Sequence, residues 1–394
     1  MRIISFCHYL QGPAAMQYLA DMGAEIIKVE PPNGAFERHW AGADHARIGG
    51  VSAFFLCANR NVRSLALDLK RPESREVIMR LIESSHVLAE NFRPGTLDRL
   101  GLGYEAVKAR KPDIIYASAS GFGAAGPYAQ RPGQDLLIQA MSGLAAIGAT
   151  DGRPVPVGSS VVDQHGAALF ALAISGAYSK LLANGKGTKV ESTLLNAAID
   201  LQTESIVTYY ASGAGRDRIK RDSHLGSWYH SAPYGIYRVK DGYIALSLNE
   251  LSVLGAALDS PDVLAAADRN AYEDRDAIAG LVARAIGERD LADLSQAFDS
   301  KGVWYAQVED YDDVLHNPQL RVNGGLEIVN VNGVEVTLAG HPVTYDGKRP
   351  GFRSFALKPG ADTRPILQDA GFAPCELERL LRDGIVFAPA EASE

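Results

Sequence analysis

Short apolar segments alternate with helix-patterned segments through the first part of the chain, and this alternation limits the possible folds more than any other feature. Residues 3–6 and 114–119 have the length and apolar character of buried strands. Residues 72–84 have the spacing of an amphipathic helix, with proline in its first turn. Strands that alternate with helices form a mainly parallel sheet covered by helices. The sequence therefore predicts an α/β fold.

The expected elements follow this alternation up to residue 211. We expect strands over residues 3–6, 26–30, 64–68, 86–90 and 114–119, and helices over residues 13–22, 72–84, 134–143, 163–182 and 194–211, the last of which follows directly on residues 189–192. Residues 1–211 are therefore expected to form most of one large α/β domain.

The composition changes after residue 211. Residues 212–232 are rich in Gly, Arg, Asp, Ser and aromatic residues, which is typical of a linker or an active-site loop. Residues 233–322 are expected to form a smaller α+β domain. In the remaining residues, 323–394, Asn332 and Gly333 predict a tight hairpin turn, and helices are expected over 363–370 and 376–383.

Composition excludes several classes of protein. The chain has 394 residues, which is enough for two domains, and a formal net charge of −8, which argues against nucleic acid as the main partner. Its three cysteines, Cys7, Cys57 and Cys375, are widely spaced and indicate neither a disulfide framework nor a metal site. The first residues lack the apolar core of a signal peptide. We expect a cytoplasmic protein that binds no metal.

Asp163 stands at the start of the most apolar predicted helix, residues 163–182. Neighbouring elements must bury such a helix, so a carboxylate at its first turn lies at the edge of the core. Helix N-termini favour anions, which helps to keep this carboxylate ionised. From the residues alone two interpretations stay open: Asp163 caps the helix, or it performs chemistry.

A glycine-rich segment, residues 121–126, fits the pattern G-x-G-x-x-G of dinucleotide-binding proteins. Pro127 follows at the point where the helix of that motif would already be running, and residues 141–149 contain no acidic residue for a ribose hydroxyl. These glycines are better explained by a tight loop, so we expect no bound nicotinamide cofactor.

Several separate segments resemble the class III CoA-transferase family, which includes formyl-CoA transferase and carnitine CoA-transferase and has α-methylacyl-CoA racemase as a relative. The segments resemble those of the family in their residues and occur in the same order, and together they cover most of the chain. The matching segments are residues 12–32, 59–70, 90–102, 120–127, 133–143, 185–190 and 232–237. The chain departs from the family pattern at Ala35, where an acidic residue is usual, and at Val62, where a basic residue is common.

The resemblance implies that Asp163 is the nucleophile. Moving CoA between two acids without hydrolysis requires the enzyme to hold CoA as a thioester, and only a carboxylate side chain can do so. Asp163 would attack the donor acyl-CoA, and the released thiolate would attack the resulting anhydride to give an aspartyl-CoA thioester. His165, two residues later, is expected to have an orienting or structural role, although a direct role stays open.

The resemblance also implies binding residues for acyl-CoA, which is a substrate here and not a permanently bound cofactor. The expected CoA-binding residues are Leu69, Lys70, Asn91, Phe92, Arg93, Arg99, Gln134 and Asp135, and the expected acyl-site residues are Leu10, Gln11, Gly226 and Trp228. Among these, Lys70, Arg93 and Arg99 would supply cations for the phosphates, while Leu69 and Phe92 would contact adenine. Arg38 is a further candidate cation for an acidic acyl group.

Three alternatives remain. A racemase of this family needs a histidine before the aspartate at position 135, and Gln134 stands there, whose amide takes no proton at neutral pH. CoA could move within one dicarboxylate, or the protein could bind acyl-CoA without catalysis. The donor and acceptor acids are not indicated by the sequence.

The resemblance further implies a Rossmann-like large domain built from both chain ends, with residues 323–394 returning to it and the smaller domain inserted between. It also implies ring-like protomers that form an interlocked homodimer, whose partners are acyl-CoA and small carboxylic acids rather than nucleic acid or membrane.

Overall fold

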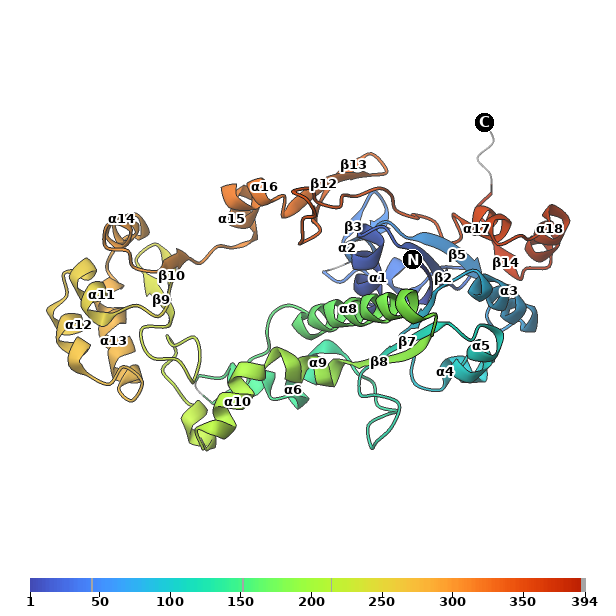
Figure 1. Ribbon diagram of the computed structural model, residues 1–394. Coiled ribbons are helices and arrows are strands. Elements are labelled where there is room, and N and C mark those ends of the chain that lie inside the picture. The colour runs from blue at the N-terminus through green and yellow to red at the C-terminus, as the bar shows by residue number, and fades with distance from the viewer. Residues whose placement is uncertain (44, 151, 214, 391–394) are drawn as a thin grey trace. The chain divides into compact units, whose positions relative to one another are not determined.

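The computed structural model describes residues 1–43, 45–150, 152–213 and 215–390. These residues form two compact units (Figure 1). The larger unit comprises residues 1–138, 160–201 and 318–394, and the smaller unit comprises residues 139–159 and 202–317. The chain therefore leaves and re-enters the larger unit twice.

A seven-stranded sheet organises the larger unit, in the order β14-β5-β2-β1-β6-β7-β8. All neighbouring strands run parallel except the edge strand β14, which is antiparallel to β5. The strands are β1 (Arg2–Phe6), β2 (Glu25–Glu30), β5 (Arg63–Leu67), β6 (Val87–Glu90), β7 (Ile115–Ser120), β8 (Thr188–Thr193) and β14 (Val386–Phe387). The expected α/β class with a mostly parallel sheet is confirmed.

The strand order places a topological switch point at the centre of the sheet. From β1 the chain builds outward through β2 and β5 on one side and through β6, β7 and β8 on the other. In open α/β sheets, ligands bind in the crevice beyond the carboxyl ends of the strands at such a point. The loops after β1 and after β6 therefore mark the place to look for a site.

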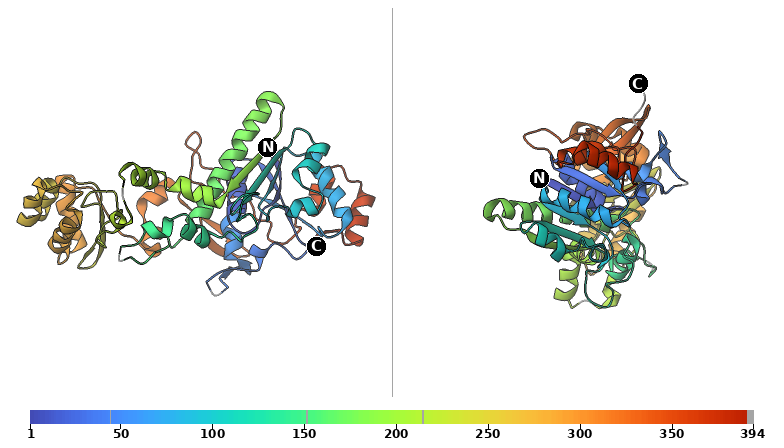
Figure 2. Two further views of the ribbon diagram at one scale, coloured as in Figure 1. Left: turned by 90° about the horizontal axis from the view of Figure 1, so that it is seen from below. Right: turned by 90° about the vertical axis from the view of Figure 1, so that its right-hand side faces the viewer.

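Helices cover both faces of this sheet, with one hydrophobic core on each side (Figures 1 and 2). On one face α8 (Val161–Asn184) packs against α1 (Gln11–Asp21), and Phe170 and Ile174 are buried beside Met16 and Leu19. On the other face α3 (Pro72–Glu83) packs with α17 (Thr363–Asp369) and α18 (Pro374–Arg382). Although α8 is long and apolar enough by composition to cross a membrane, it is part of this core.

Shorter elements complete the larger unit. These are η1 (Phe36–Arg38), β3 (Arg47–Ile48), β4 (Val51–Ser52), α2 (Ala53–Ala58), α4 (Thr96–Arg99), α5 (Tyr104–Arg110), α6 (Asp135–Met141), α9 (Leu194–Leu201), α16 (Pro318–Asn323), β12 (Leu326–Val331) and β13 (Val334–Ala339). The hairpin β12–β13 turns at Asn332 and Gly333, as the sequence predicts.

The predicted helix over residues 194–211 is wrong in one respect: the structure divides it into α9 and α10 (Thr203–Ala211) at Gln202. Gln202 has φ −102° and ψ 16°, outside the helical region, and its side chain amide donates to the carbonyl of Ser142. The break coincides with the boundary between the two units at residues 201 and 202. Apolar periodicity continues across the break, so the pattern alone does not reveal it.

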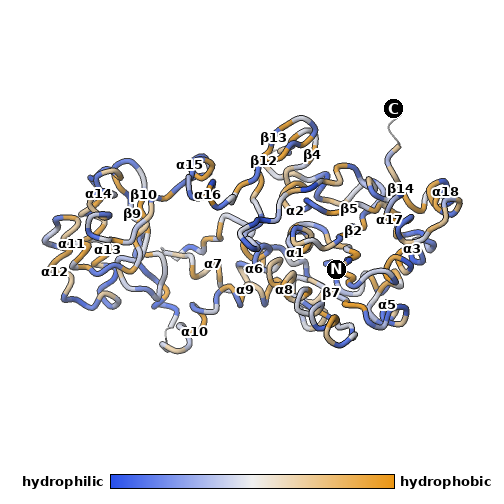
Figure 3. Tube along the Cα trace, turned by 45° about the horizontal axis from the view of Figure 1, so that its top comes forward, coloured by the Kyte–Doolittle hydropathy of each residue, from blue (hydrophilic) through white to orange (hydrophobic). Residues whose placement is uncertain are grey.

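The smaller unit packs helices on a three-stranded antiparallel sheet in the order β11-β10-β9. Its core contains Leu254, Val282 and Phe298. Figure 3 shows hydrophobic stretches along the helices of this unit. Its elements are α7 (Leu144–Ile147), α10, η2 (Arg216–Ile219), β9 (Gly235–Val239), β10 (Gly242–Leu246), α11 (Leu251–Leu258), α12 (Pro261–Ala265), η3 (Ala266–Asp268), α13 (Arg275–Ile286), α14 (Leu291–Lys301), β11 (Tyr305–Gln307) and α15 (Tyr311–His316).

Candidate active site

One side chain joins the two loops at the switch point. Asn91, directly after β6, accepts a hydrogen bond from the backbone N–H of His8 at 2.9 Å and donates to the carbonyl of the same residue at 2.8 Å. The loop after β1 is thereby fixed to the loop after β6. Asn91 is one of the predicted CoA-binding residues, and the structure places it at the switch point, directly after β6.

The loop after β1 is also tight. A side chain at Gly12 would lie 2.6 Å from Cβ of Cys7 and 3.1 Å from Nδ2 of Asn91, so only glycine fits at the start of α1. Tyr9 has φ +64°, in the left-handed region that is strained for residues with a side chain. Beneath the loop, the buried Lys28 donates to the carbonyl of Cys7 and pairs with the buried Glu37. This backbone is held in one conformation by its surroundings.

Gln11, at the start of α1, points toward α8. The residue is 4% exposed, and its Nε2 atom has no hydrogen-bond partner among the described residues. A Cβ atom added at Gly166 of α8 would lie 2.8 Å from this nitrogen. An unsatisfied buried donor costs free energy, so its retention indicates a polar group that binds from outside the chain. Leu10, the neighbouring predicted residue, is buried.

Asp163 lies in the first turn of α8, one helical turn before Gly166. Burial, and to a smaller extent the nearby carboxylate of Asp135, together raise the pKa of its carboxyl group to about 7. A carboxylate of this basicity is a stronger nucleophile than an ordinary exposed aspartate. The sequence indicates the position of this group but not its pKa.

Asp135 supplies the hydrogen bonds that the first turn of α8 needs. Its Oδ2 atom accepts the backbone N–H of Val162 at 2.8 Å and that of Asp163 at 2.9 Å. Ser160, at the usual capping position, makes no capping bond with its side chain. The carboxylate of Asp135 therefore caps the helix from a distant part of the chain, which is a contact that sequence pattern does not disclose.

His165 pairs with a different carboxylate, on α9. Its Nε2 atom lies 2.8 Å from Oδ2 of Asp200 on α9. Residues two positions apart point to nearly opposite sides of a helix, so His165 and Asp163 face different neighbours. This geometry fits the structural role that the sequence analysis expects for His165.

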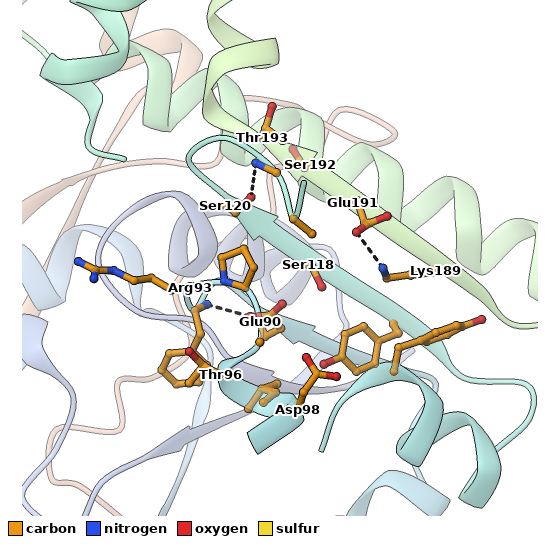
Figure 4. A pocket seen from close by; sticks show the side chains of 18 residues that line it. Glu90, Arg93, Thr96, Asp98, Ser118, Ser120, Lys189, Glu191, Ser192 and Thr193 are labelled. Atoms are coloured by element: carbon orange, nitrogen blue, oxygen red, sulfur yellow. Dashed lines mark hydrogen bonds and ion pairs between the residues drawn. The ribbon is translucent and has the colours of Figure 1, made fainter. Parts of the chain in front are cut away.

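A pocket opens beyond the carboxyl ends of β6, β7 and β8 (Figure 4). Phe92 and Arg93 line it, together with the carboxylates Glu90, Asp98 and Glu191. Figure 4 shows the Arg93 side chain extending away from these carboxylates. Burial raises the pKa of Glu90, which also accepts the backbone N–H of Phe92 at 2.8 Å.

The remaining predicted CoA-binding residues lie on the same unit. Leu69 packs against the core, the backbone N–H of Lys70 donates to Asp68, and Arg99 donates to the Thr96 hydroxyl at 3.1 Å. Gln134 directly precedes α6. The sequence analysis does not single out the pocket residues Ser118, Lys189 and Thr193. Of these, only Thr193 stands at the carboxyl end of its strand, where a sequence signal could have indicated it.

Arg38 is not available to bind an acidic acyl group. Its guanidinium is buried and donates to both carboxylate oxygens of Glu30, each at 2.7 Å. It also donates to backbone carbonyls of Leu357 and Ala356. The expectation that Arg38 lines an acyl pocket is therefore wrong, because this side chain holds the C-terminal segment to the larger unit.

The predicted loop residues Gly226 and Trp228 belong to the smaller unit. Trp228 is 1% exposed, and its indole N–H donates to the hydroxyl of Ser205 at 3.0 Å. A Cβ atom at Gly226 would lie 3.0 Å from the Tyr234 ring. Both residues have packing roles within that unit, and their contact with substrate stays a prediction.

The larger unit is thus an α/β domain with the Rossmann strand order, in which Asn91 joins the loops after β1 and β6 at the switch point and a half-buried carboxylate of raised pKa lies in the first turn of α8. Among residues 1–390, apart from those not described, no cluster of three His, Cys, Asp or Glu side chains is arranged to hold a metal ion. These features define the class of an α/β protein in which a carboxylate of raised pKa lies at a helix N-terminus.

The chain belongs to CoA-transferase family III, whose model matches residues 1–363. It is 30% identical to succinyl-CoA:glutarate CoA-transferase of Mus musculus, over 98% of this chain and 89% of that protein. It is 30% identical to succinyl-CoA:mesaconate CoA-transferase of Haloarcula hispanica, over 89% and 90% of the two chains. The sequence-based resemblance is confirmed, and the protein is an enzyme of the CoA-transferase type.

The fold agrees with a solved structure. A CaiB/BaiF family protein from Brucella suis superimposes with a TM-score of 0.80 at 28% identity, covering 94% of this chain and 98% of that one. Acetyl-CoA:oxalate CoA-transferase of Acetobacter aceti is another relative, 28% identical over 89% of this chain and 90% of its own length.

Proposed function

We propose that the protein transfers CoA from an acyl-CoA donor to a free carboxylic acid through a covalent intermediate on Asp163. The observation that carries this proposal is the carboxylate at the start of α8, whose pKa is raised to about 7 by burial and by Asp135. Three of its relatives are named for small carboxylic acids, namely glutarate, mesaconate and oxalate. A small acid is therefore the proposed acceptor here as well.

The reaction begins with an attack of the Asp163 carboxylate oxygen on the thioester carbonyl of the donor. The carbon–sulfur bond breaks, CoA leaves as the thiolate, and a mixed anhydride remains on Asp163. The thiolate then attacks the aspartyl carbonyl, which releases the donor acid and forms an aspartyl-CoA thioester. The acceptor carboxylate reverses these two steps, so that acyl-CoA leaves and Asp163 is restored.

The pKa of about 7 serves this sequence of steps. The carboxylate is substantially ionised at neutral pH and needs no general base, and its raised basicity favours attack on a thioester. The N-terminus of α8 is the positive end of the helix dipole, which stabilises the oxygens that carry charge during the attack.

CoA binding is assigned to the larger unit. Arg93, Arg99 and Lys70 are the proposed cations for the phosphates, and Phe92 and Leu69 are the proposed apolar contacts for adenine. Support comes from Asn91, which fixes the loop carrying Phe92 and Arg93 at the switch point. Gln11 is the proposed donor to the acyl group, because its buried amide lacks a partner among the described residues.

We also propose that two copies of the chain associate as an interlocked homodimer in the cytoplasm. Large apolar side chains are exposed on α8 and α10, among them Leu172, Leu182 and Tyr210, which are 68%, 70% and 77% exposed. Exposed apolar surface of this kind favours association. Light scattering after size-exclusion chromatography is expected to give twice the mass of one chain, and a monomer would contradict the proposal.

Replacement of Asp163 tests the covalent mechanism. Asp163→Ala and Asp163→Asn are expected to abolish CoA transfer from a panel of acyl-CoA donors to free acids. Hydroxylamine added during turnover of the unchanged enzyme is expected to convert Asp163 to a hydroxamate, detectable by peptide mass spectrometry. Near-normal transfer by both variants would overturn the covalent mechanism.

The same assay separates the alternatives. A racemase would exchange the α-proton of an acyl-CoA with deuterated water in the absence of any acceptor acid. We expect no such exchange alongside CoA transfer, because Gln134 replaces the second base. Binding of acyl-CoA with neither transfer nor exchange would indicate a non-catalytic protein.

A further inference from the structure

The first turn of α8 depends on a carboxylate from another helix. The first N–H groups of any helix lack partners within that helix and need acceptors. In α8 two of them, at Val162 and Asp163, share the Oδ2 atom of Asp135 at 2.8 Å and 2.9 Å. Asp135 is the first residue of α6, and it lies 28 positions before Asp163 in the chain.

We propose that Asp135 is a positioning residue for the reaction: it fixes the backbone of Asp163 and holds a second negative charge beside the nucleophile. This inference rests on the proposed function, since it gives Asp135 a role in reactions at Asp163. It differs from the CoA-binding role that the resemblance implies for Asp135, because the oxygen that makes these contacts faces the protein's own helix.

The charge of Asp135 acts on one state of Asp163 more than on the others. In the resting enzyme two carboxylates lie close together in a partly buried place, and their repulsion disfavours ionised Asp163. In the anhydride and in the thioester, Asp163 carries no charge, so the repulsion is absent. Asp135 therefore raises the free energy of the resting nucleophile relative to the intermediates that form from it.

Other titratable groups on elements packed against the start of α8 contact different residues. Tyr18 of α1 lies 3.5 Å from Gln164, and Asp200 of α9 pairs with His165. On β8, Lys189 and Glu191 pair with each other at 2.8 Å. Among these groups, only Asp135 bonds directly to the backbone of Asp163.

The substitution Asp135→Asn separates charge from capping. Its amide oxygen can still accept both N–H groups, while the negative charge is gone. We expect the acidic limb of the pH profile of kcat/KM to move about one pH unit lower. We expect the plateau of kcat to fall about threefold, because a less basic carboxylate is a weaker nucleophile.

Two further variants keep the proposal testable if Asp135→Asn does not fold. Asp135→Ser keeps a hydroxyl acceptor without charge and is expected to move the limb in the same direction. Asp135→Glu keeps the charge and is expected to leave the limb close to that of the unchanged enzyme. Asp200→Asn is the matched control, because it removes a nearby carboxylate that pairs with His165 of α8.

A purely structural cap would predict a different result. The proposal is overturned if both Asp135→Asn and Asp135→Ser leave the acidic limb in place, or if Asp200→Asn moves it as far. Failure of the proposed function is distinguishable, because it would appear as undiminished transfer by Asp163→Asn. An unmoved limb in an enzyme that requires Asp163 would contradict only the role of Asp135.

Discussion

Asp163 combines two properties that oppose each other in an ordinary protein: it is half-buried, and in the proposed mechanism it must carry charge to react. Burial is the first cause of its raised pKa, and Asp135 is the second. A folded-state pKa of about 7, above the ordinary 3.8, means that ionisation of this group disfavours the folded state. The stability of the protein and the reactivity of the nucleophile are therefore set against each other.

This opposition predicts a pH-dependent effect of Asp163→Asn on stability. At a pH below the pKa of the unfolded chain, Asp163 is neutral in both the folded and the unfolded state, and its contribution to the free energy of unfolding is fully present. This contribution is lost as the pH rises through about 7. At pH 8 Asp163→Asn is therefore expected to be more stable than the unchanged protein by about 1–3 kcal/mol. Denaturant unfolding at pH 5 and pH 8 measures this difference, and an equal or opposite effect at the two pH values would contradict it.

The activity of the unchanged enzyme has its own pH dependence. Because protonated Asp163 is no nucleophile, kcat/KM is expected to fall tenfold for each pH unit well below about 7. Initial rates between pH 5 and pH 9 with a fixed donor and acceptor measure the limb. A limb near the ordinary aspartate value of 3.8 would show that burial does not raise this pKa in solution.

At the scale of elements, the contact between α1 and α8 aligns Gln11 with the turn that follows Asp163. Gly166 makes this approach possible, since a Cβ atom there would lie 2.8 Å from Nε2 of Gln11 and 3.3 Å from Cδ2 of Leu194. Gly176, on the same helix, has open space at the corresponding point. Close packing therefore accounts for glycine at position 166 of α8 but not for glycine at position 176.

We predict that Gly166→Ala displaces the Gln11 side chain and lowers CoA transfer at least tenfold. Gly176→Ala is the matched control, and it is expected to stabilise the protein by about 0.5–1 kcal/mol through helix propensity without changing the rate. In the Gln11→Ala background, Gly166→Ala is expected to have little further effect on transfer. Independent losses from the two substitutions would contradict the contact.

Prediction from sequence succeeded where one segment determines its own structure. The central parallel strands β1, β2, β6 and β7 are mainly apolar and buried, and the residues at 332 and 333 favour the tight turn that the structure has there. The edge strand β14 has only two residues and no readable pattern, and its place depends on pairing with β5. The capping of α8 by Asp135 and the pKa of Asp163 depend on contacts between distant residues, which sequence pattern does not specify.

At the scale of the whole molecule, the C-terminal residues are integral to the larger unit. Arg60 donates to both carboxylate oxygens of the buried Asp21 and to the carbonyl of Ala339, and His341 lies 3.2 Å from the same carboxylate. A buried carboxylate bonded to groups from several segments ties those segments together. Arg38, which was expected at an acyl pocket, performs the same kind of task at Ala356 and Leu357.

Breaking this buried pair is expected to be costly. Arg60→Met leaves Asp21 without its main cation and is predicted to reduce the free energy of unfolding by about 3–5 kcal/mol. The matched control is Arg63→Met, which removes a partly exposed partner of Glu25 and is expected to cost less than about 1 kcal/mol. Urea unfolding of both variants measures the two losses in the free energy of unfolding. Equal losses would show that the buried pair stabilises the protein no more than the partly exposed pair does.

The amide of Asn91 has a consequence for the order of events during turnover. The Asn91 side chain hydrogen-bonds to the backbone of His8 through both its oxygen and its nitrogen. The loop after β1 and the loop after β6 therefore cannot shift independently of each other. In the proposed mechanism the donor and the acceptor occupy the enzyme in succession, so both would bind against the same fixed loops. Selectivity between the two acids would then have to come from the groups that surround these loops.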